Sequence, residues 1–249
     1  MSENKEEHYE TKAPKLSSLS SKLDGFLNLL YPTKCLVCAK VLPHSKYLPA
    51  CDGCFLGFNL VNEIVTGDFS FDRNLSFFEY NDTLKEIIHN IKFGKRAHKM
   101  ANLAKLAVKV AENKGSVFSD YEGFDAVIPV PLHKKRFRER GFNQAYVLAK
   151  ELSKAINVPI DDNICERAIY TLPQSMMSAG NRQENVAGIF SLKKDSHVSG
   201  KKFVLVDDIF TTGETLNSLA SLLKESGAKS IVCITVGIAH AKPLKTDTH

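Results

Sequence analysis

The segment Phe203-Val-Leu-Val-Asp-Asp-Ile-Phe-Thr-Thr-Gly-Glu-Thr215 is the most informative part of this chain. Its first four residues are apolar, which predicts a strand buried within a sheet. Two adjacent carboxylates, Asp207 and Asp208, follow at the carboxyl end of that strand, where open α/β sheets bind their ligands. A hydroxyl-rich turn then leads into a helix. This order predicts an α/β fold with a ligand site at one edge of the sheet.

The turn after the acid pair has the composition of a phosphate site. Gly213 allows the backbone to approach a ligand closely, and the N–H groups and dipole of a helix start attract an anion. Carboxylates suit vicinal hydroxyls, so the predicted ligand resembles ribose 5-phosphate. A Walker lysine and a three-glycine dinucleotide fingerprint are both absent, which argues against P-loop NTPases and Rossmann dehydrogenases. The alternative is a strand, loop and helix with an incidental acidic pair. The candidate phosphate residues are Thr211, Thr212, Gly213, Glu214 and Thr215.

Apolar strands alternate with amphipathic helices along most of the chain. Strands are expected at residues 75–80, 125–130, 203–206 and 231–236, and helices at 22–30, 82–92, 100–114, 143–156 and 215–226. This alternation predicts a parallel sheet covered by helices on both faces. Residues 166–200 show no clean period and are long for a plain loop, so they form either an active-site lid or an unrecognised hairpin.

Length and composition describe an ordinary globular protein. The 249 residues are 43% hydrophobic, enough for one core and a small appended module. No apolar run is long enough to span a bilayer and the N-terminus lacks a signal core, so a cytoplasmic protein without membrane insertion is expected. The net charge of +5 suits an anionic ligand without indicating nucleic acid. The expected division is a disordered tail at 1–21, a four-cysteine module at 22–62, the main domain at 63–240 and a flexible tail at 241–249.

Two cysteine pairs lie near the N-terminus. Cys35 and Cys38 precede Cys51 and Cys54, with twelve residues between the pairs. Paired thiolates at this spacing suit a structural Zn²⁺ with four protein ligands. Two disulfides, free buried thiols and an iron–sulfur cluster are the alternatives.

The segment Phe203–Thr215 resembles the motif with which type I phosphoribosyltransferases bind 5-phosphoribosyl pyrophosphate (PRPP). Only Phe210 departs from it, because a smaller aliphatic residue is usual there. The resemblance implies a type I phosphoribosyltransferase-like fold, a parallel-sheet core flanked by helices. It also implies that Asp207 and Asp208 contact the ribose hydroxyls, directly or through waters of Mg²⁺, and that Thr211–Thr215 hold the 5-phosphate.

A basic segment follows the strand at residues 125–130. His133–Arg140 contains five Lys or Arg and one Glu, a local charge of 5 − 1 = +4. In type I phosphoribosyltransferases the loop at this position holds the pyrophosphate, and Asn143 and Gln144 then begin a helix where they could orient a ligand. A solvated, basic start of a helix is the alternative, and the stretch Lys92–Lys99 is equally a phosphate contact or a solvated joint. The candidate pyrophosphate residues are Pro131, His133, Lys134, Arg136 and Arg140.

Several segments together resemble the ComF family of bacterial competence-associated proteins. They are residues 80–93, the basic segment, Arg167–Gln174, Arg182–Asn185 and 188–190, and the family carries the same four-cysteine module. The resemblance implies catalytic roles for Arg167 and Arg182 beside the two aspartates. It also implies a mobile lid that excludes water; a structural hairpin is the alternative. The candidate lid residues are Gln174, Arg182 and Asn185.

Two functions are compatible with these features. The first is an enzyme that transfers the phosphoribosyl group of PRPP to an unidentified acceptor with loss of pyrophosphate. The second is a non-catalytic competence protein that binds single-stranded DNA during DNA uptake, with PRPP as regulator and competence proteins as partners. A homodimer is plausible by analogy alone.

Overall fold

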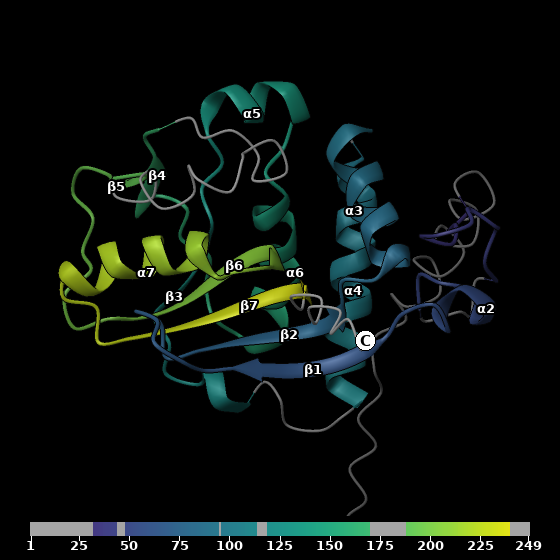
Figure 1. The fold of residues 1–249 in the computed structure, drawn as a ribbon, viewed down its shortest axis with the longest axis horizontal. Helices are drawn as coiled ribbons and strands as arrows, with labels where there is room; N and C mark the ends of the chain where they lie inside the picture. Colours follow the sequence, from purple (N-terminus) through teal and green to yellow (C-terminus); the bar gives the residue numbers. More distant parts are fainter. Residues whose placement is uncertain (1–31, 44–47, 95, 114–118, 170–187, 240–249) are drawn as a thin grey trace, which may run out of the picture.

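A mixed sheet of five strands forms the centre of the computed structural model, which describes residues 32–43, 48–94, 96–113, 119–169 and 188–239. The spatial order is β1-β2-β7-β6-β3, in which β1 pairs antiparallel to β2 and every other neighbouring pair is parallel. The strands are β1 (Leu60–Val65), β2 (Arg73–Glu79), β3 (Ala126–Pro129), β6 (Lys202–Phe210) and β7 (Ser230–Ile238). Figure 1 shows β6 and β7 running toward the end of the sheet beside α3.

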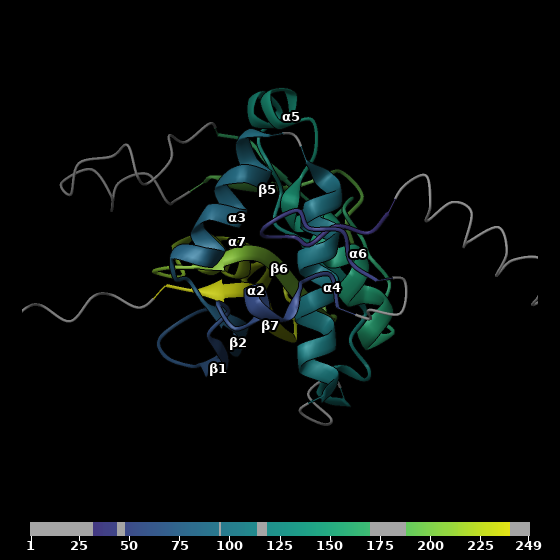
Figure 2. The same cartoon turned by 90° about the vertical axis from the view of Figure 1, so that its right-hand side faces the viewer.

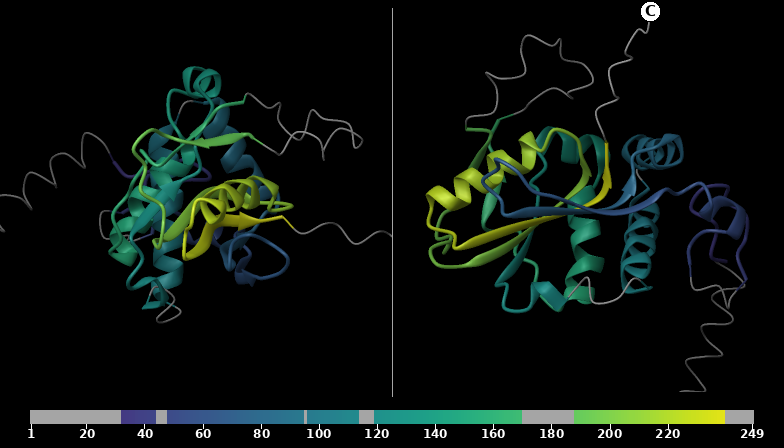
Figure 3. Two further views of the ribbon diagram at one scale, coloured as in Figure 1. Left: turned by 90° about the vertical axis from the view of Figure 1, so that its left-hand side faces the viewer. Right: turned by 60° about the horizontal axis from the view of Figure 1, so that its bottom comes forward.

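Helices cover both faces of this sheet, as the apolar strands require. Val204 and Val206 of β6 pack with apolar residues of α3, α4 and α6, whereas Phe203 and Leu205 pack with those of α7. Figure 3 shows α7 on one side of the sheet and α6 on the other, and Figure 2 shows α4 beside α6. The helices are α2 (Asp52–Phe55), α3 (Asp82–Phe93), α4 (Ala97–Asn113), α5 (Lys134–Arg140), α6 (Gln144–Ile156) and α7 (Glu214–Glu225), with a 3-10 turn at Ser119–Tyr121.

The elements expected within the described residues are present, with three differences that matter for the site. The residues of α5 were predicted as a basic loop or helix start, and they form a short helix. The unassigned stretch at 166–200 begins and ends in an antiparallel pair, β4 (Cys165–Arg167) with β5 (Phe190–Leu192). The predicted tails at 1–21 and 241–249 and the helix at 22–30 lie outside the described residues. No helix in the described ranges combines the length and apolar character needed to cross a bilayer.

Strand β6 is longer than the predicted 203–206, and its extra length creates the site. Strand β3 ends at Pro129, opposite Val206, whereas β6 continues beside β7 until Phe210 pairs with Ile238. Among the described residues, the edge of β6 that faces β3 therefore has no strand partner beyond Val206. The acid pair lies in this projecting end of the strand.

Candidate functional site

The acid pair is partly buried and held by its own backbone. Asp207 Oδ1 accepts a hydrogen bond from the N–H of Asp208 at 2.8 Å, and Asp208 Oδ1 accepts one from the N–H of Ile209 at 2.9 Å. Burial, and then the neighbouring charge of Asp208, raise the pKa of Asp207 to about 7. Two carboxylates packed this closely are a site that a cation or hydroxyl donors would stabilise.

Three cations from separate elements surround the acid pair. Lys92, in the last turn of α3, places Nζ 2.7 Å from Asp208 Oδ2. Burial lowers the pKa values of Arg140 in α5 and Arg167 in β4, and the charges of Asp208 and Asp207, respectively, oppose that lowering. The sequence patterns pointed to both arginines but left Lys92 undecided. Its only signal is its place at the end of an amphipathic helix, before a glycine and more basic residues.

The hydroxyl-rich turn is shaped by a glycine that no other residue could replace without strain. Gly213 has φ +78°, and a Cβ there would lie 2.9 Å from Phe210 Cζ and 3.0 Å from Phe69 Cε1. Phe210, the one departure from the family's motif, is buried and meets Phe69 and Phe71 edge to face. Its ring therefore supports the turn from beneath. Thr211 and Thr212 remain exposed, and α7 begins at Glu214.

The basic segment folds onto the same edge of the sheet. His133 caps α5, because its Nδ1 accepts from the N–H of Lys135 at 3.2 Å. Asn143 caps α6 by accepting from the N–H of Ala145 at 3.0 Å, and its Nδ2 donates to the carbonyl of Val130 at 3.0 Å. The amide of Asn143 is therefore used by the backbone, and it anchors the start of α6 to the end of β3.

A cavity of about 560 Å³ lies between α5, the start of α6 and β4. Its lining combines apolar rings with charged side chains, and includes Pro131, Lys134, Phe137, Tyr146 and Arg167. Phe137 and Tyr146 are 49% and 40% exposed, so aromatic surface faces solvent here. The predicted pyrophosphate loop and Arg167 thus share one hollow.

Four residues of the predicted lid segment were assigned lid or catalytic roles, and the structure describes only one of them, Arg167. Its guanidinium carbon lies 5.5 Å from the ring centroid of Phe190, the first residue of β5. Gln174, Arg182 and Asn185 lie outside the described residues. The hairpin pair β4–β5 brings the two ends of the segment that contains them next to each other.

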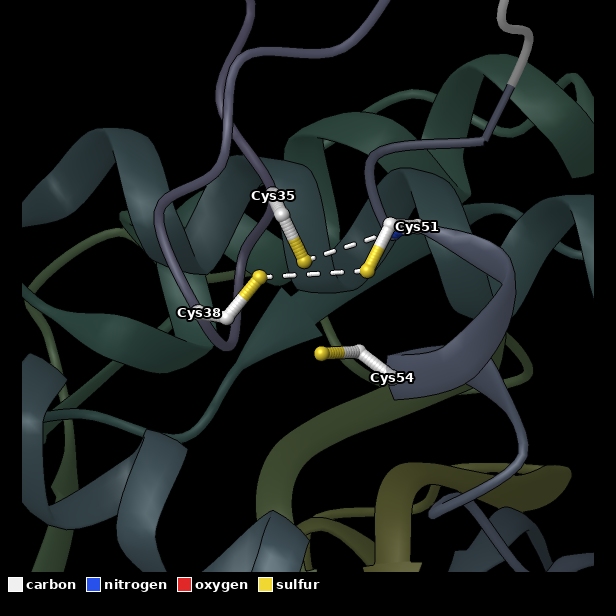
Figure 4. A group of neighbouring side chains, drawn as sticks. All are labelled: Cys35, Cys38, Cys51 and Cys54. Carbon is white, nitrogen blue, oxygen red and sulfur yellow. Dashed lines mark hydrogen bonds between the residues drawn. The ribbon is translucent and has the colours of Figure 1, made fainter.

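The four cysteines of the N-terminal module form one cluster (Figure 4). The Sγ atoms of Cys35, Cys38, Cys51 and Cys54 all lie within 4.8 Å of one another, and all are free thiols. Burial acts to raise the pKa of the Cys35 thiol. Hydrogen bonds from backbone N–H groups, of which that of Cys51 has the largest effect, outweigh burial and lower the pKa to about 6. Such a cluster could hold a metal ion of tetrahedral preference. The ring centroid of the neighbouring Phe58 lies 5.2 Å from that of Phe78 in β2, and this contact joins the module to the main core.

The chain is similar to known proteins over most of its length. Residues 142–249 match the model of the phosphoribosyl transferase domain. Competence protein F of Haemophilus influenzae is 33% identical over 65% of this chain and 71% of that protein. DNA utilization protein YhgH of Escherichia coli is 31% identical over 64% of this chain and 69% of that protein.

Among solved structures, a hypoxanthine phosphoribosyltransferase of Staphylococcus aureus aligns with a TM-score of 0.35 and 19% identity, over 61% of this chain and 70% of that one. The matched domain and the mostly parallel sheet with helices on both faces are those of a type I phosphoribosyltransferase fold. With its identity to competence protein F and its four-cysteine cluster, the chain belongs to the ComF family of competence-associated, phosphoribosyltransferase-like proteins.

Proposed function

We propose that this chain binds PRPP together with Mg²⁺ at the projecting end of β6. The observation that carries the proposal is the juxtaposition of Asp207 and Asp208, beyond the end of β3, with the turn around Gly213 at the start of α7. Carboxylates recognise the ribose hydroxyls and favour the hydrated cation, while the turn and the helix start favour the 5-phosphate. One ligand with both groups fits both parts of the site.

The surrounding basic residues give the pyrophosphate its place in this proposal. Pro131, His133, Lys134, Arg136 and Arg140 lie in the loop and short helix directly after β3. Guanidinium groups bind phosphate oxygens in pairs and remain charged at every relevant pH. The charges of Asp207 and Asp208 act on Arg140, and that of Asp207 acts on Arg167. This supports a role for both guanidinium groups in stabilising the negative charge of the leaving group.

The activity that follows is transfer of the phosphoribosyl group to an acceptor with release of pyrophosphate. Catalysis of this kind depends mainly on positioning and on electrostatic stabilisation of the leaving group. Mg²⁺ would supply charge neutralisation when bound. The chain's own contribution would be to hold the sugar by its aspartates, to hold the diphosphate by its arginines, and to exclude water through the lid residues Gln174, Arg182 and Asn185.

Calorimetry with Mg²⁺-PRPP tests this proposal directly. We expect binding by the unchanged protein and loss of binding in Asp207→Asn combined with Asp208→Asn. Asp120→Asn is the matched control, since Asp120 pairs with Arg73 before the start of β3, at the opposite end of the sheet. Pyrophosphate release across purines, pyrimidines and amines then tests transfer. Absence of PRPP binding by the unchanged protein overturns the proposal. If PRPP binds but no acceptor in the panel causes pyrophosphate release, the transferase activity is overturned.

A second function is supported by the surface of α5. This helix carries five basic residues, and Phe137, which lies between two of them, is 49% exposed. Basic side chains contact phosphates and exposed aromatic rings stack on bases, which is how proteins bind single-stranded DNA. The relatives named for competence and for DNA utilization support the same direction. We propose that PRPP then regulates a DNA-binding competence protein that works with other competence proteins.

Single-strand binding at several salt concentrations distinguishes this second function. Arg138→Gln with Phe137→Ala should weaken binding and reduce the slope of log affinity against log salt by about one. Lys154→Gln is the control, because Lys154 is 63% exposed and pairs with Glu151 on α6. The double asparagine variant of the acid pair should retain DNA binding. Binding without salt dependence contradicts this function.

For the four-cysteine cluster we propose a structural Zn²⁺. Four thiolates leave no open coordination position, so the metal would stabilise the module without taking part in catalysis. Free thiols also suit a reducing compartment such as the cytoplasm. Metal analysis of purified protein should give one zinc per chain.

A further inference from the structure

Gln144, the first residue of α6, contains a buried donor without an acceptor. The residue is 3% exposed, and its Oε1 accepts a hydrogen bond from Arg140 at 2.9 Å. Within the described part of the chain, its Nε2 has no hydrogen-bond partner. A buried polar group left unpaired costs stability and is rare in folded proteins, so each one calls for an explanation.

Arg140 fixes which end of the amide is paired. A guanidinium group only donates hydrogen bonds, so it must meet the amide oxygen and not the NH₂ group. The NH₂ group of Gln144 is thereby left for another acceptor. Rotating the amide by half a turn would place two donors against each other, so the unpaired donor is a consequence of the Arg140 contact.

The start of α6, which carries Gln144, lies at the ligand edge of the sheet. Asn143 ties the start of α6 to the carbonyl of Val130, directly after β3. Arg140, which contacts Gln144, also lies within electrostatic range of Asp208 and Asp207. The start of a 13-residue helix adds its partial positive charge at the same place. An anionic oxygen would find a donor, a cation and a helix dipole together.

A second buried amide shows that this fold pairs such groups elsewhere. Asn74 of β2 is fully buried, and its Nδ2 donates to Ser76 Oγ at 2.9 Å and to Thr235 Oγ1 at 3.3 Å. The unpaired donor of Gln144 therefore differs from a buried amide whose role is to join two strands.

We propose that Gln144 Nε2 donates a hydrogen bond to a diphosphate oxygen of the bound sugar pyrophosphate. This inference rests on the proposed function, and it adds a ligand-binding residue from α6 to the pyrophosphate residues of the basic segment. Gln144 supplies a neutral, directional donor beside the charge of Arg140. Its unpaired state in the ligand-free protein is offset when the ligand binds.

The test compares three ligands in Gln144→Met, which keeps the side-chain length and removes both the Nε2 donor and the Oε1 acceptor of Arg140. Calorimetry with Mg²⁺-pyrophosphate and with Mg²⁺-PRPP should show affinities lower by about tenfold or more, the loss of one hydrogen bond to a charged group. Ribose 5-phosphate, which has no diphosphate, should bind as it does to the unchanged protein. Gln144→Glu keeps the length and the acceptor for Arg140 but converts the donor into a second acceptor, and it should lose diphosphate binding in the same way.

Unfolding of the ligand-free variants supplies a readout that a structural role would not produce. Gln144→Met removes the unpaired donor together with one hydrogen bond from Arg140, so it should lose little stability. Asn74→Leu removes an amide that is paired on both strands, so it should lose more. Equal diphosphate affinity, equal weakening of all three ligands, or a loss of stability like that of Asn74→Leu each overturns the inference. If the unchanged protein binds PRPP, such a result leaves the proposed function standing; if it does not, the proposed function itself has failed.

Discussion

The ammonium group of Lys92 lies 2.7 Å from Oδ2 of Asp208, and 27% and 14% of the two side chains are exposed. The contact joins the last turn of α3 to the projecting end of β6. A cation of the protein thus pairs with a carboxylate that the proposed function assigns to the ribose hydroxyls or the waters of Mg²⁺. It also lowers the pKa of Asp207, against the effect of burial.

Replacing Lys92 with Met should destabilise the protein, because it leaves two carboxylates together without their nearest cation. We expect a loss of about 1 to 3 kcal/mol in the free energy of unfolding at pH 8, measured by urea denaturation. Lys109→Met is the matched control, since Lys109 lies equally close to Glu112, at 2.7 Å, and that carboxylate is 41% exposed against 14% for Asp208. Its cost should stay below about 0.5 kcal/mol. Equal losses in the two variants would show that the Lys92 contact has no special weight.

Asp207→Asn should make the protein more stable at pH 8 while it abolishes PRPP binding. The pKa of Asp207 is about 7 in the folded protein, against about 3.9 in an unfolded chain. Between these values the folded state holds the extra proton, so stability falls as the pH rises from about 4 to 7. The variant lacks this loss, and we expect it to gain about 1 to 3 kcal/mol at pH 8 and almost nothing at pH 4. Thermal unfolding across this pH range measures the difference. A variant less stable than the unchanged protein at pH 8 contradicts the raised pKa of Asp207.

Gly213→Ala should destabilise the phosphate turn for two separable reasons. The positive φ costs about 1 kcal/mol in any residue with a Cβ. The contacts of 2.9 and 3.0 Å with Phe210 and Phe69 add a steric cost of about 1 to 3 kcal/mol. Gly200→Ala isolates the first effect, since Gly200 has φ +75° and no atom lies within 4 Å of the position that a Cβ would take there. Chemical denaturation of both variants should give the larger loss at Gly213, together with weaker binding of ribose 5-phosphate. Equal losses of stability in the two variants would mean that the rings of Phe210 and Phe69 move aside at no measurable cost.

Removing the metal should unfold the N-terminal module. If zinc is bound, a chelator should lower the midpoint of thermal unfolding, because metal binding is coupled to folding. Cys38→Ser should reduce the zinc content to nearly zero. Cys165→Ser is the control, since Cys165 is buried and lies outside the four-cysteine cluster. Full zinc content in Cys38→Ser would remove this residue from the site.

The order of strands and helices was predictable because most helices have apolar residues at a helical period and most strands are apolar runs. Strand β1 was missed, since Leu60–Val65 contains two polar residues in its centre and lies at the edge of the sheet. The helix α5 was missed as a helix because its residues are nearly all charged and none is buried. Val61 and Val65 of β1 do pack against the core, but the polar residues between them interrupt the alternation, and α5 has no hydrophobic face. A hydrophobic face is the main signal of secondary structure in a sequence.

The sequence by itself determined the sheet-and-helix order, the acid pair, the turn around Gly213 and the two cysteine pairs, because each is a local pattern of residue types. Only the tertiary structure decided that β6 projects past β3, that Lys92 reaches Asp208, and that Arg140 leaves the NH₂ of Gln144 without a partner in the described part of the chain. These contacts join elements whose relative positions follow from packing of the whole core, and no local pattern of residues records such positions.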